Sequence, residues 1–218
     1  MHIPPYDNEN NPIVDANNKT VPLNYFNIVK LKKGDAFEYQ VPGYETCIVP
    51  ATGTININVE GIEFQMLGNR VEDVWDGEPE GVYVPVGAKA EMACMSENAE
   101  VFIAGAKYDK VLIPFDVREY DLVQYGSDET KTHRKIKHIL GQKQHDKVGR
   151  LLVSELIQLV PEAGQDFQVT NMIQTESQKK HVTMKPIISV SNQIGALVCR
   201  CFNGCLLYTS PSPRDSCA

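Results

Sequence analysis

Histidine, the side chain best suited to metal ligation and to proton transfer near neutral pH, is unevenly placed in this chain. Five histidines occur in 218 residues, and none lies between residues 3 and 132. Three of them, His133, His138 and His145, share one basic stretch. A metal site made of imidazoles needs a carboxylate partner as well, and no carboxylate stands at a binding spacing from these three. We therefore expect a solvated connection here, and no histidine-ligated metal in the residues before it.

Two charged residues that precede this stretch, Glu45 and Arg70, could contact a ligand. We interpret both as solvated or paired surface charges. The lysines and arginines between Lys131 and Lys147 could bind a sugar acid, but runs of charge usually form solvated faces. The residues by themselves therefore assign no catalytic, substrate-binding or metal-ligating side chain.

Charge and composition restrict the class of protein. A formal net charge of −7 argues against nucleic acid or an anionic membrane as the main partner. No apolar run approaches the length of a membrane span, and the first residues lack the basic-then-apolar layout of a signal peptide. Of the six cysteines, Cys47 and Cys94 each lie in a strand-like run, as small buried hydrophobes in a reducing compartment do. We expect a cytoplasmic protein, and the sequence leaves its oligomeric state open.

Short strand-like segments dominate the first half of the chain. Residues 1–20 are polar and are predicted to form an N-terminal arm. Residues 54–59 (TININV) alternate apolar and polar side chains, which predicts one buried face. Short strands from residue 21 to 106, with no helical period between them, indicate a sandwich or barrel, and we choose an all-β antiparallel jelly-roll barrel. The predicted strands are Tyr25–Leu31, Ala36–Val41, Thr46–Ala51, Gly53–Val59, Ile62–Leu67, Val71–Trp75, Gly81–Val86, Lys89–Cys94 and Glu100–Ala104.

Beyond the predicted barrel the pattern changes twice. Residues 107–149 are charged and less periodic, and they are predicted to be a linker. Residues 150–160 (RLLVSELIQLV) are strongly apolar and are followed by Pro161. As a strand, this segment would open a second sheet, while periodicity alone leaves a buried helix open.

Five sequence motifs occur in order between residues 21 and 164. In this order and at this spacing they resemble bacterial 5-deoxy-glucuronate isomerase, an enzyme of inositol breakdown and a bicupin with two cupin barrels. The resemblance implies that residues 21–106 are the first cupin barrel, 107–149 the inter-barrel linker and 150–164 the first strand of the second cupin. The motifs are ETCIVPATGTINI (45–57), LGNRVEDVWDGEP (67–79), VYVP (82–85), RKIKHIL (134–140) and LLVSE (151–155).

The resemblance also implies a reaction, an aldose–ketose isomerisation of a deoxy sugar acid. In the intact family member a divalent metal in the second barrel and a base would move a proton through an enediolate. The implied partner is a small-molecule sugar acid. The family's linker has a His-Asn pair where this chain has Lys137 and His138, so we carry no role onto His138. Two alternatives stay open: a related 4-deoxy-5-keto uronate isomerase, and a metal-free cupin module that binds a sugar or a partner.

The resemblance ends near Gly164. The family continues into WSSYPPHKHD, whose histidines begin its metal site, whereas this chain continues QDFQVTNM. Codons read one base out of register permit FSSYKHD in place of FQVTNMI, and the Met172 codon forces the final Asp. The Met184 codon likewise forces the Glu that precedes a family-like TYY. We therefore hypothesise that residues 165–204 are out-of-frame translation of the second cupin.

The last residues, 205–218, contain CLLYTSPSPRD, which resembles a translated sequencing adapter, so we predict no part of the fold from it. Under this hypothesis His181 and the Cys-Arg-Cys at 199–201 have no role, and the second-barrel metal ligands are not encoded. We then expect no cofactor in this chain, and an inactive polypeptide that is poorly folded after Gly164. A genuine, divergent C-terminal segment is the rival interpretation. Sequencing the source DNA distinguishes the two, because an unbroken frame from Leu151 onward contradicts the hypothesis.

Overall fold

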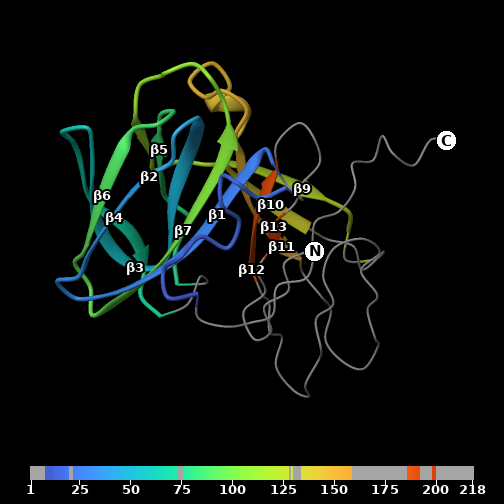
Figure 1. Ribbon diagram of the computed structural model, residues 1–218. Coiled ribbons are helices and arrows are strands. Elements are labelled where there is room, and N and C mark those ends of the chain that lie inside the picture. The colour runs from blue at the N-terminus through green and yellow to red at the C-terminus, as the bar shows by residue number, and fades with distance from the viewer. Residues whose placement is uncertain are drawn as a thin grey trace.

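The computed structural model describes residues 8–19, 22–72, 76–127, 129, 134–158, 186–191 and 198–199, with side chains as far as Glu155 except that of Arg134. These residues form two antiparallel sheets (Figure 1), so the predicted all-β fold class is confirmed. The larger sheet has eight strands: β1 (Asn24–Lys32), β2 (Ala36–Gln40), β3 (Tyr44–Val59), β4 (Ile62–Arg70), β5 (Gly81–Val84), β6 (Lys89–Cys94), β7 (Asn98–Lys107) and β8 (Phe115–Val117). The smaller sheet has five: β9 (Asp121–Tyr125), β10 (Arg134–Leu140), β11 (Leu152–Gln158), β12 (Pro186–Ser191) and β13 (Val198–Cys199). A 3-10 turn, Gln142–Gln144, follows β10.

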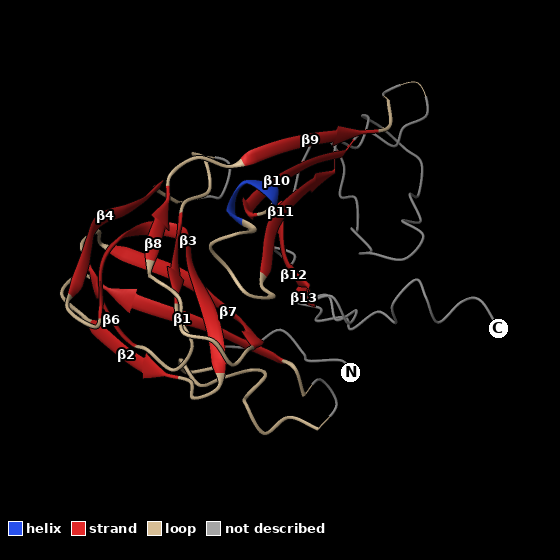
Figure 2. Cartoon of the chain, turned by 90° about the horizontal axis from the view of Figure 1, so that it is seen from above, coloured by secondary structure: helices blue, strands red, loops and turns tan. Residues whose placement is uncertain are grey.

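The long strand β3 joins the two layers of the barrel. Its first half pairs with β7 and β5, and its second half pairs with β6 and β4. The sequence predicted two strands here, and the structure makes them one, with a register shift on either side of Gly53. Gly53 has φ +79°, a conformation that glycine adopts without steric cost. In Figure 2, β2, β4 and β6 therefore lie on one side of the barrel, and β1, β7 and β8 lie between them and the smaller sheet.

The burial pattern of β3 shows where the two cores lie. Residues 44–51 are all buried, whereas residues 52–59 alternate between half-buried and buried. The first half is therefore covered on both faces, which explains its nearly continuous apolar sequence. An inner core fills the barrel and includes Val29, Ile48, Ile55, Ile57, Leu67, Val101 and Ile103. An outer core covers the other face of the same strands and includes Phe26, Cys47, Val49, Tyr83, Phe102, Val117, Ile139, Leu140, Leu151 and Val153.

The described part of the N-terminal arm packs against β1. Val14 is buried and forms an isolated bridge with Phe26. The amide of Asn8 donates to the side-chain oxygen of Asn27 at 2.9 Å and to the carbonyl of Ile28 at 3.0 Å. The arm thus covers one edge of the outer core.

The segment predicted to be a solvated linker is in large part a component of the fold, which corrects that expectation. It contains β8, β9 and β10, and Ile139 and Leu140 at the end of β10 are fully buried in the outer core. Strand β10 pairs with β9 on one side and with β11 on the other. The lysines of RKIKHIL suggested a solvated segment. A long basic side chain can nevertheless lie along a sheet and still reach a carboxylate. Lys137 does so, with its side chain 12% exposed.

Two further sequence predictions change in detail. Residues 150–160 contain a strand, β11, so the helix alternative is excluded for Leu152–Gln158. A strand was also predicted at Val71–Trp75. In the structure β4 ends at Arg70, and residues 71 and 72 form a bend in place of the start of that strand. Residues 73–75 lie outside the described residues.

Most of the chain after β11 also lies outside the described residues, including His181, Cys201 and the adapter-like residues 205–218. Strands β12 and β13 are exceptions, in a segment where the sequence showed no clear strand pattern. β12 reads PIISVS, whose β-branched residues favour a strand, and it pairs with β11. The reading frame of residues 165–204 stays a hypothesis. Among the described residues no helix is long and apolar enough to cross a membrane.

The bend at Gly53 gives a first testable prediction. A Cβ there would lie against the carbonyl oxygen of Asn98 and 2.7 Å from the Cα of Ala99. Gly34 has a similar φ, +84°, with no atom within 4 Å of its Cβ position. We expect Gly34→Ala to lower the free energy of unfolding by about 1–2 kcal/mol through backbone strain alone, and Gly53→Ala to lower it by clearly more. Urea unfolding measures both, and equal losses would contradict the close packing at the bend.

Candidate functional site

Two β-bulges in β4 bring the guanidinium of Arg70 to the boundary between the barrel and the smaller sheet. Strand β4 advances from Phe64 to Leu67 while β3 moves only from Ile57 to Ile55. A second extra residue separates Leu67 from Arg70, which pairs with Gly53. An extra residue shifts the alternation of side chains along the strand. As a result both Leu67 and Arg70 are buried.

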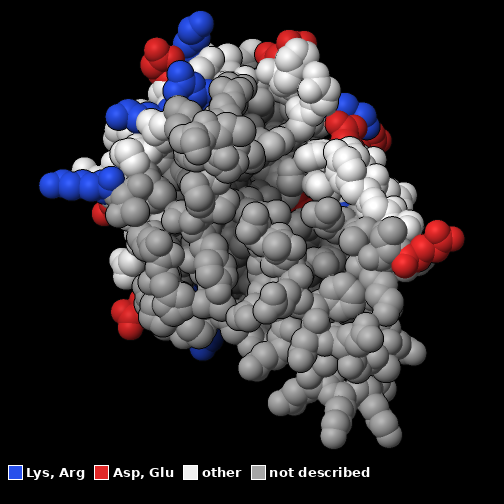
Figure 3. Space-filling view, turned by 90° about the vertical axis from the view of Figure 1, so that its right-hand side faces the viewer, with Lys and Arg blue, Asp and Glu red and all other residues white. Residues whose placement is uncertain are grey.

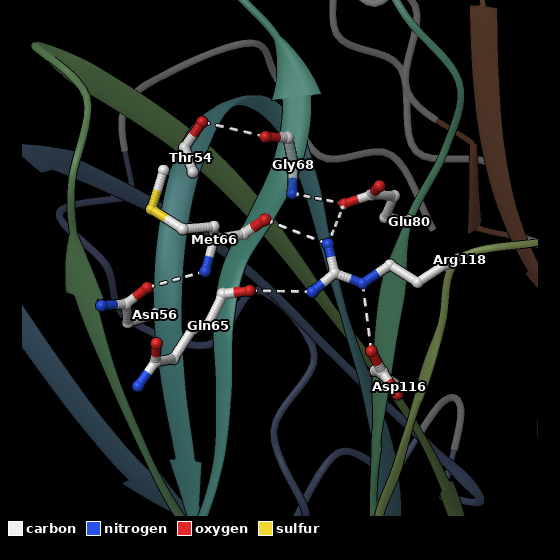
Figure 4. Close-up of polar contacts among 8 residues, drawn as sticks. All are labelled: Thr54, Asn56, Gln65, Met66, Gly68, Glu80, Asp116 and Arg118. Carbon is white, nitrogen blue, oxygen red and sulfur yellow. Dashed lines mark hydrogen bonds and ion pairs between the residues drawn. The ribbon is translucent and has the colours of Figure 1, made fainter.

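Arg118 holds the first bulge in place, as Figure 4 shows. Its Nη2 donates to the carbonyl of Gln65 at 2.8 Å, and its Nη1 donates to the carbonyl of Met66 at 3.0 Å. The same guanidinium forms ion pairs with Glu80 at 3.1 Å and with Asp116 at 3.0 Å. These contacts satisfy carbonyl groups that the bulge removes from the β3–β4 ladder.

Neighbouring side chains replace the other backbone bonds that the bulges break (Figure 4). Met66 has φ +53°, and its N–H donates to the side-chain oxygen of Asn56 at 2.8 Å. The N–H of Gly68 donates to Glu80 at 2.7 Å, and the hydroxyl of Thr54 donates to the carbonyl of Gly68 at 2.9 Å. The polar groups of this cluster are thus used to fix the shape of β4.

Arg70 forms a buried ion pair with Glu155 of β11. Its Nη2 lies 2.5 Å from Oε2 of Glu155, and its Nε donates to the carbonyl of Gly77 at 2.9 Å. Both charged side chains are 1% exposed. The expectation of a surface charge at Arg70 was therefore wrong, because the bulges direct the side chain inward. Arg70 Nη1 and Glu155 Oε1 are buried without a hydrogen-bond partner among the described residues.

Lys137, Glu78 and Tyr120 surround this pair. Lys137 lies opposite Glu155 in the β10–β11 register, and its Nζ is 2.5 Å from a carboxylate oxygen of Glu78. The same Nζ lies 5.3 Å from the centre of the Tyr120 ring, within the range of a cation–π contact. Positive and negative groups therefore alternate along the boundary, and each faces a partner of opposite sign.

The environment of these groups shifts two pKa values. Partial burial tends to raise the pKa of Glu78, but hydrogen bonds from Lys137 and Tyr120 outweigh it, and the pKa lies below its usual value. Burial, followed by the hydrogen bond to Glu78, raises the pKa of Tyr120 to about 12. Tyr120 therefore stays neutral and donates a hydrogen bond to Glu78, which stays ionised at neutral pH.

Glu45 forms the second buried contact between the barrel and the chain that leads into β11. Its carboxylate accepts hydrogen bonds from the hydroxyl of Tyr83 at 2.7 Å and from three successive backbone N–H groups. These belong to Gly149, Arg150 and Leu151, at 2.8, 2.5 and 2.9 Å. Glu45 is fully buried, so the expectation of a surface charge was wrong here as well. Burial and then the bond to Glu45 hold the pKa of Tyr83 well above its usual range.

The histidines of the basic stretch do not come together. His138 Nδ1 lies 2.6 Å from the hydroxyl of Ser154 across the β10–β11 pair. His145 is 60% exposed and contacts the carbonyl of Gln142 and the carboxylate of Asp146. His133 lies outside the described residues. No group of three or more His, Cys, Asp or Glu side chains that could hold a metal occurs within the described part of the chain, so these residues do not fit the divalent metal that the family resemblance implies.

Basic and acidic side chains of the described residues are interspersed on one face of the molecule (Figure 3). On the side shown in Figure 3, Lys and Arg side chains of the described residues lie close to Asp and Glu side chains. Two lysines of the basic stretch also have partners, because Lys143 pairs with Asp121 at 2.8 Å and Lys147 lies 5.5 Å from the centre of the Phe115 ring. These lysines contact groups within the protein.

Glu155 is the site residue that sequence reasoning missed. The available signal was one acidic residue inside the apolar run LLVSELIQLV. A carboxylate in such a strand is buried only with a cation or several donors beside it. The partner, Arg70, is 85 residues away in the sequence, so the pair itself required the tertiary structure.

Comparison with known proteins identifies the family. A family model described as the KduI/IolB family matches residues 2–164. The chain belongs to the KduI/IolB family. This is a family of sugar isomerases that includes 5-deoxy-glucuronate isomerase and 4-deoxy-5-ketouronate isomerase. The resemblance seen in residues 21–164 is therefore confirmed at the level of the family.

A solved IolB-like structure shares the fold. An IolB-like protein from Salmonella typhimurium is 19% identical with a TM-score of 0.62, over 71% of this chain and 57% of that one. This likeness confirms a cupin-type fold, and this chain spans 57% of the length of that protein. The protein Ylba from E. coli is 14% identical with a TM-score of 0.48, over 75% of this chain and 62% of that one. No curated protein matches the chain.

The Glu45 contacts lead to a prediction about stability. Glu45→Gln puts an N–H donor where the carboxylate accepts from backbone N–H groups, so at least one buried donor loses its acceptor. We expect the free energy of unfolding to fall by about 1–3 kcal/mol. The control is Glu97→Gln, whose side chain is 82% exposed and whose replacement should cost almost nothing. Urea denaturation compares the two, and a similar small effect for both would show that the Glu45 contacts do not stabilise the fold.

The Arg70–Glu155 pair leads to a second prediction about stability. Arg70→Met or Glu155→Leu alone leaves a buried charge unpaired and should cost about 3–5 kcal/mol of unfolding free energy, whereas the double variant should cost less than either. The matched control is the exposed pair Lys33–Glu97, at 3.1 Å, where the same substitutions should change stability by less than about 1 kcal/mol. Additive losses at Arg70 and Glu155 in a double-mutant cycle would contradict the pairing.

Proposed function

We propose that the chain is the front part of an aldose–ketose isomerase of inositol catabolism, which converts 5-deoxy-glucuronate into 5-dehydro-2-deoxy-gluconate. We further propose that its described barrel is a scaffold and performs no chemistry. The observation that carries this proposal is the pair of buried contacts, Glu45 with residues 149–151 and Arg70 with Glu155, which fix the strand that leads into the second barrel of the family.

The interior of the barrel supports a structural role. It is filled by aliphatic side chains such as Ile48, Ile55 and Ile103, all fully buried. The hydroxyl groups of Tyr39 and Thr46 lie within it and bond to each other at 2.8 Å. An isomerase of this kind needs a base and a means of stabilising an enediolate, and an apolar, closely packed interior supplies neither.

The two described cysteines suit a protein of the reducing cytoplasm, which is where we propose that the enzyme acts. Cys47 and Cys94 are buried and unbonded to each other, and burial holds the pKa of the Cys47 thiol far above its usual range. A neutral thiol is a poor nucleophile, so Cys47 acts as a core residue. Cys47 therefore offers no alternative catalytic group.

The sibling reaction, isomerisation of a 4-deoxy-5-keto uronate, shares this fold. The motifs RKIKHIL and LLVSE favour the inositol branch, and the structure makes them the adjacent strands β10 and β11. A metal-free cupin module remains the second candidate, and it is favoured by the lack of a metal-ligating cluster within the described residues. The sequence beyond Gly164 in the source DNA separates these candidates, because an H-x-H motif and a glutamate would indicate the enzyme.

An activity measurement tests the proposal. The 218-residue chain and a chain translated after one base is restored near Gly164 are each supplied with Mn²⁺ or Zn²⁺ and 5-deoxy-glucuronate, and the sugar is followed by NMR. We expect conversion by the restored chain and none by the 218-residue chain. Metal-dependent conversion by the 218-residue chain would refute the idea that its ligands are missing. A restored chain that folds and leaves the sugar unchanged would refute the assigned reaction.

A further inference from the structure

The Arg70–Glu155 pair leaves one donor atom and one acceptor atom without partners. Nη1 of Arg70 and Oε1 of Glu155 are buried and make no hydrogen bond to the described residues. Because both side chains are 1% exposed, bulk solvent does not serve them. Buried groups of this kind are ordinarily satisfied, and an exception in a native fold points to a bound water, ion or ligand.

The chemistry of the two atoms restricts what can satisfy them. Nη1 can only donate hydrogen bonds, and a carboxylate oxygen such as Oε1 can only accept them. Their sister atoms, Nη2 and Oε2, are 2.5 Å apart, so the unpartnered atoms flank a single short contact. A simple anion would be repelled by the carboxylate of Glu155, and a simple cation would be repelled by the guanidinium of Arg70. A hydroxyl group accepts one hydrogen bond and donates another, and therefore suits both atoms.

We propose that the boundary between the barrel and β11 contains a binding site for one hydroxyl group, which accepts from Arg70 Nη1 and donates to Glu155 Oε1. The hydroxyl belongs either to a buried water molecule or to a small polyol or hydroxy acid. This inference does not depend on the reaction proposed above, since it follows from the two unpartnered atoms alone.

Three neighbouring side chains give the site a polar approach from solvent. The side chain of Glu78 is 54% exposed, and that of its partner Lys137 is 12% exposed. The Tyr120 hydroxyl forms a hydrogen bond with Glu78, and the charges of Arg70 and Glu155 both influence its pKa. Donors and acceptors thus lie between the surface at Glu78 and the buried pair.

Crystals of the full chain, grown without any polyol and then soaked in myo-inositol or D-glucuronate, test the proposal directly. We expect an oxygen atom within about 2.7–3.2 Å of both Nη1 and Oε1. A single-atom peak that the soaks leave unchanged assigns the hydroxyl to water, and extended density in a soaked crystal assigns it to the polyol or the hydroxy acid. A direct bond between Nη1 and Oε1, a protein group bonded to either atom, or no oxygen at that place would overturn the proposal.

Thermal unfolding of the same chain distinguishes the two sources in solution. For a polyol or hydroxy acid, the unfolding midpoint should rise with myo-inositol or D-glucuronate and then level off, and Glu155→Gln should abolish the shift. Lys33→Gln, at an exposed ion pair, is the matched control and should keep it. If the hydroxyl belongs to water, the unfolding midpoint should not shift in any variant, and the crystals should show the single-atom peak. If the midpoint shifts equally in Glu155→Gln and in the control, the sugar binds elsewhere, and the oxygen in the crystal is then assigned to water. Where Glu155→Gln does not fold, the crystals decide alone.

Discussion

The carboxylate of Glu45 is the contact on which the relation between the two sheets depends. It lies on the first half of β3, where both faces of the sheet are covered, and it gathers three consecutive N–H groups of the chain entering β11. A buried carboxylate is stable only when donors replace the water it has lost. Residues 149–151 are therefore fixed against the barrel, and this brings Leu151 and Val153 into the outer core.

The Arg70–Glu155 pair adds a directional constraint to that apolar packing. Hydrophobic contacts such as those of Val153 tolerate small displacements, whereas a guanidinium and a carboxylate at 2.5 Å do not. The cost of burying both charges makes such a pair a weak source of net stability and a plausible source of specificity. In this chain it selects the register of β11, because a shift of one residue would turn Glu155 to the other face of the sheet.

Much of the barrel was predictable because its local patterns agree with its tertiary environment. TININV alternates as a strand with one covered face must, and VYVP, apolar throughout, is buried in the structure. The interface was not predictable in the same way. The basic residues of RKIKHIL interrupt any apolar pattern that would indicate a buried strand. Lys137 nevertheless lies on β10 and pairs with Glu78. Glu45 and Arg70 looked like surface charges because their partners, at residues 149–151 and 155, are distant in the sequence.

The sequence by itself determined the all-β class, the order of most strands of the barrel, the lack of histidine between residues 3 and 132, and the family through motifs that lie in a fixed order. These properties depend on residue identity and on spacing along the chain. Only the tertiary structure decided that Glu45 and Arg70 are buried, that β3 is one bent strand, and that Arg70 meets Glu155. Each of these depends on contacts across the fold or on the two bulges of β4, and a local sequence pattern carries no information about which distant groups will share a buried space.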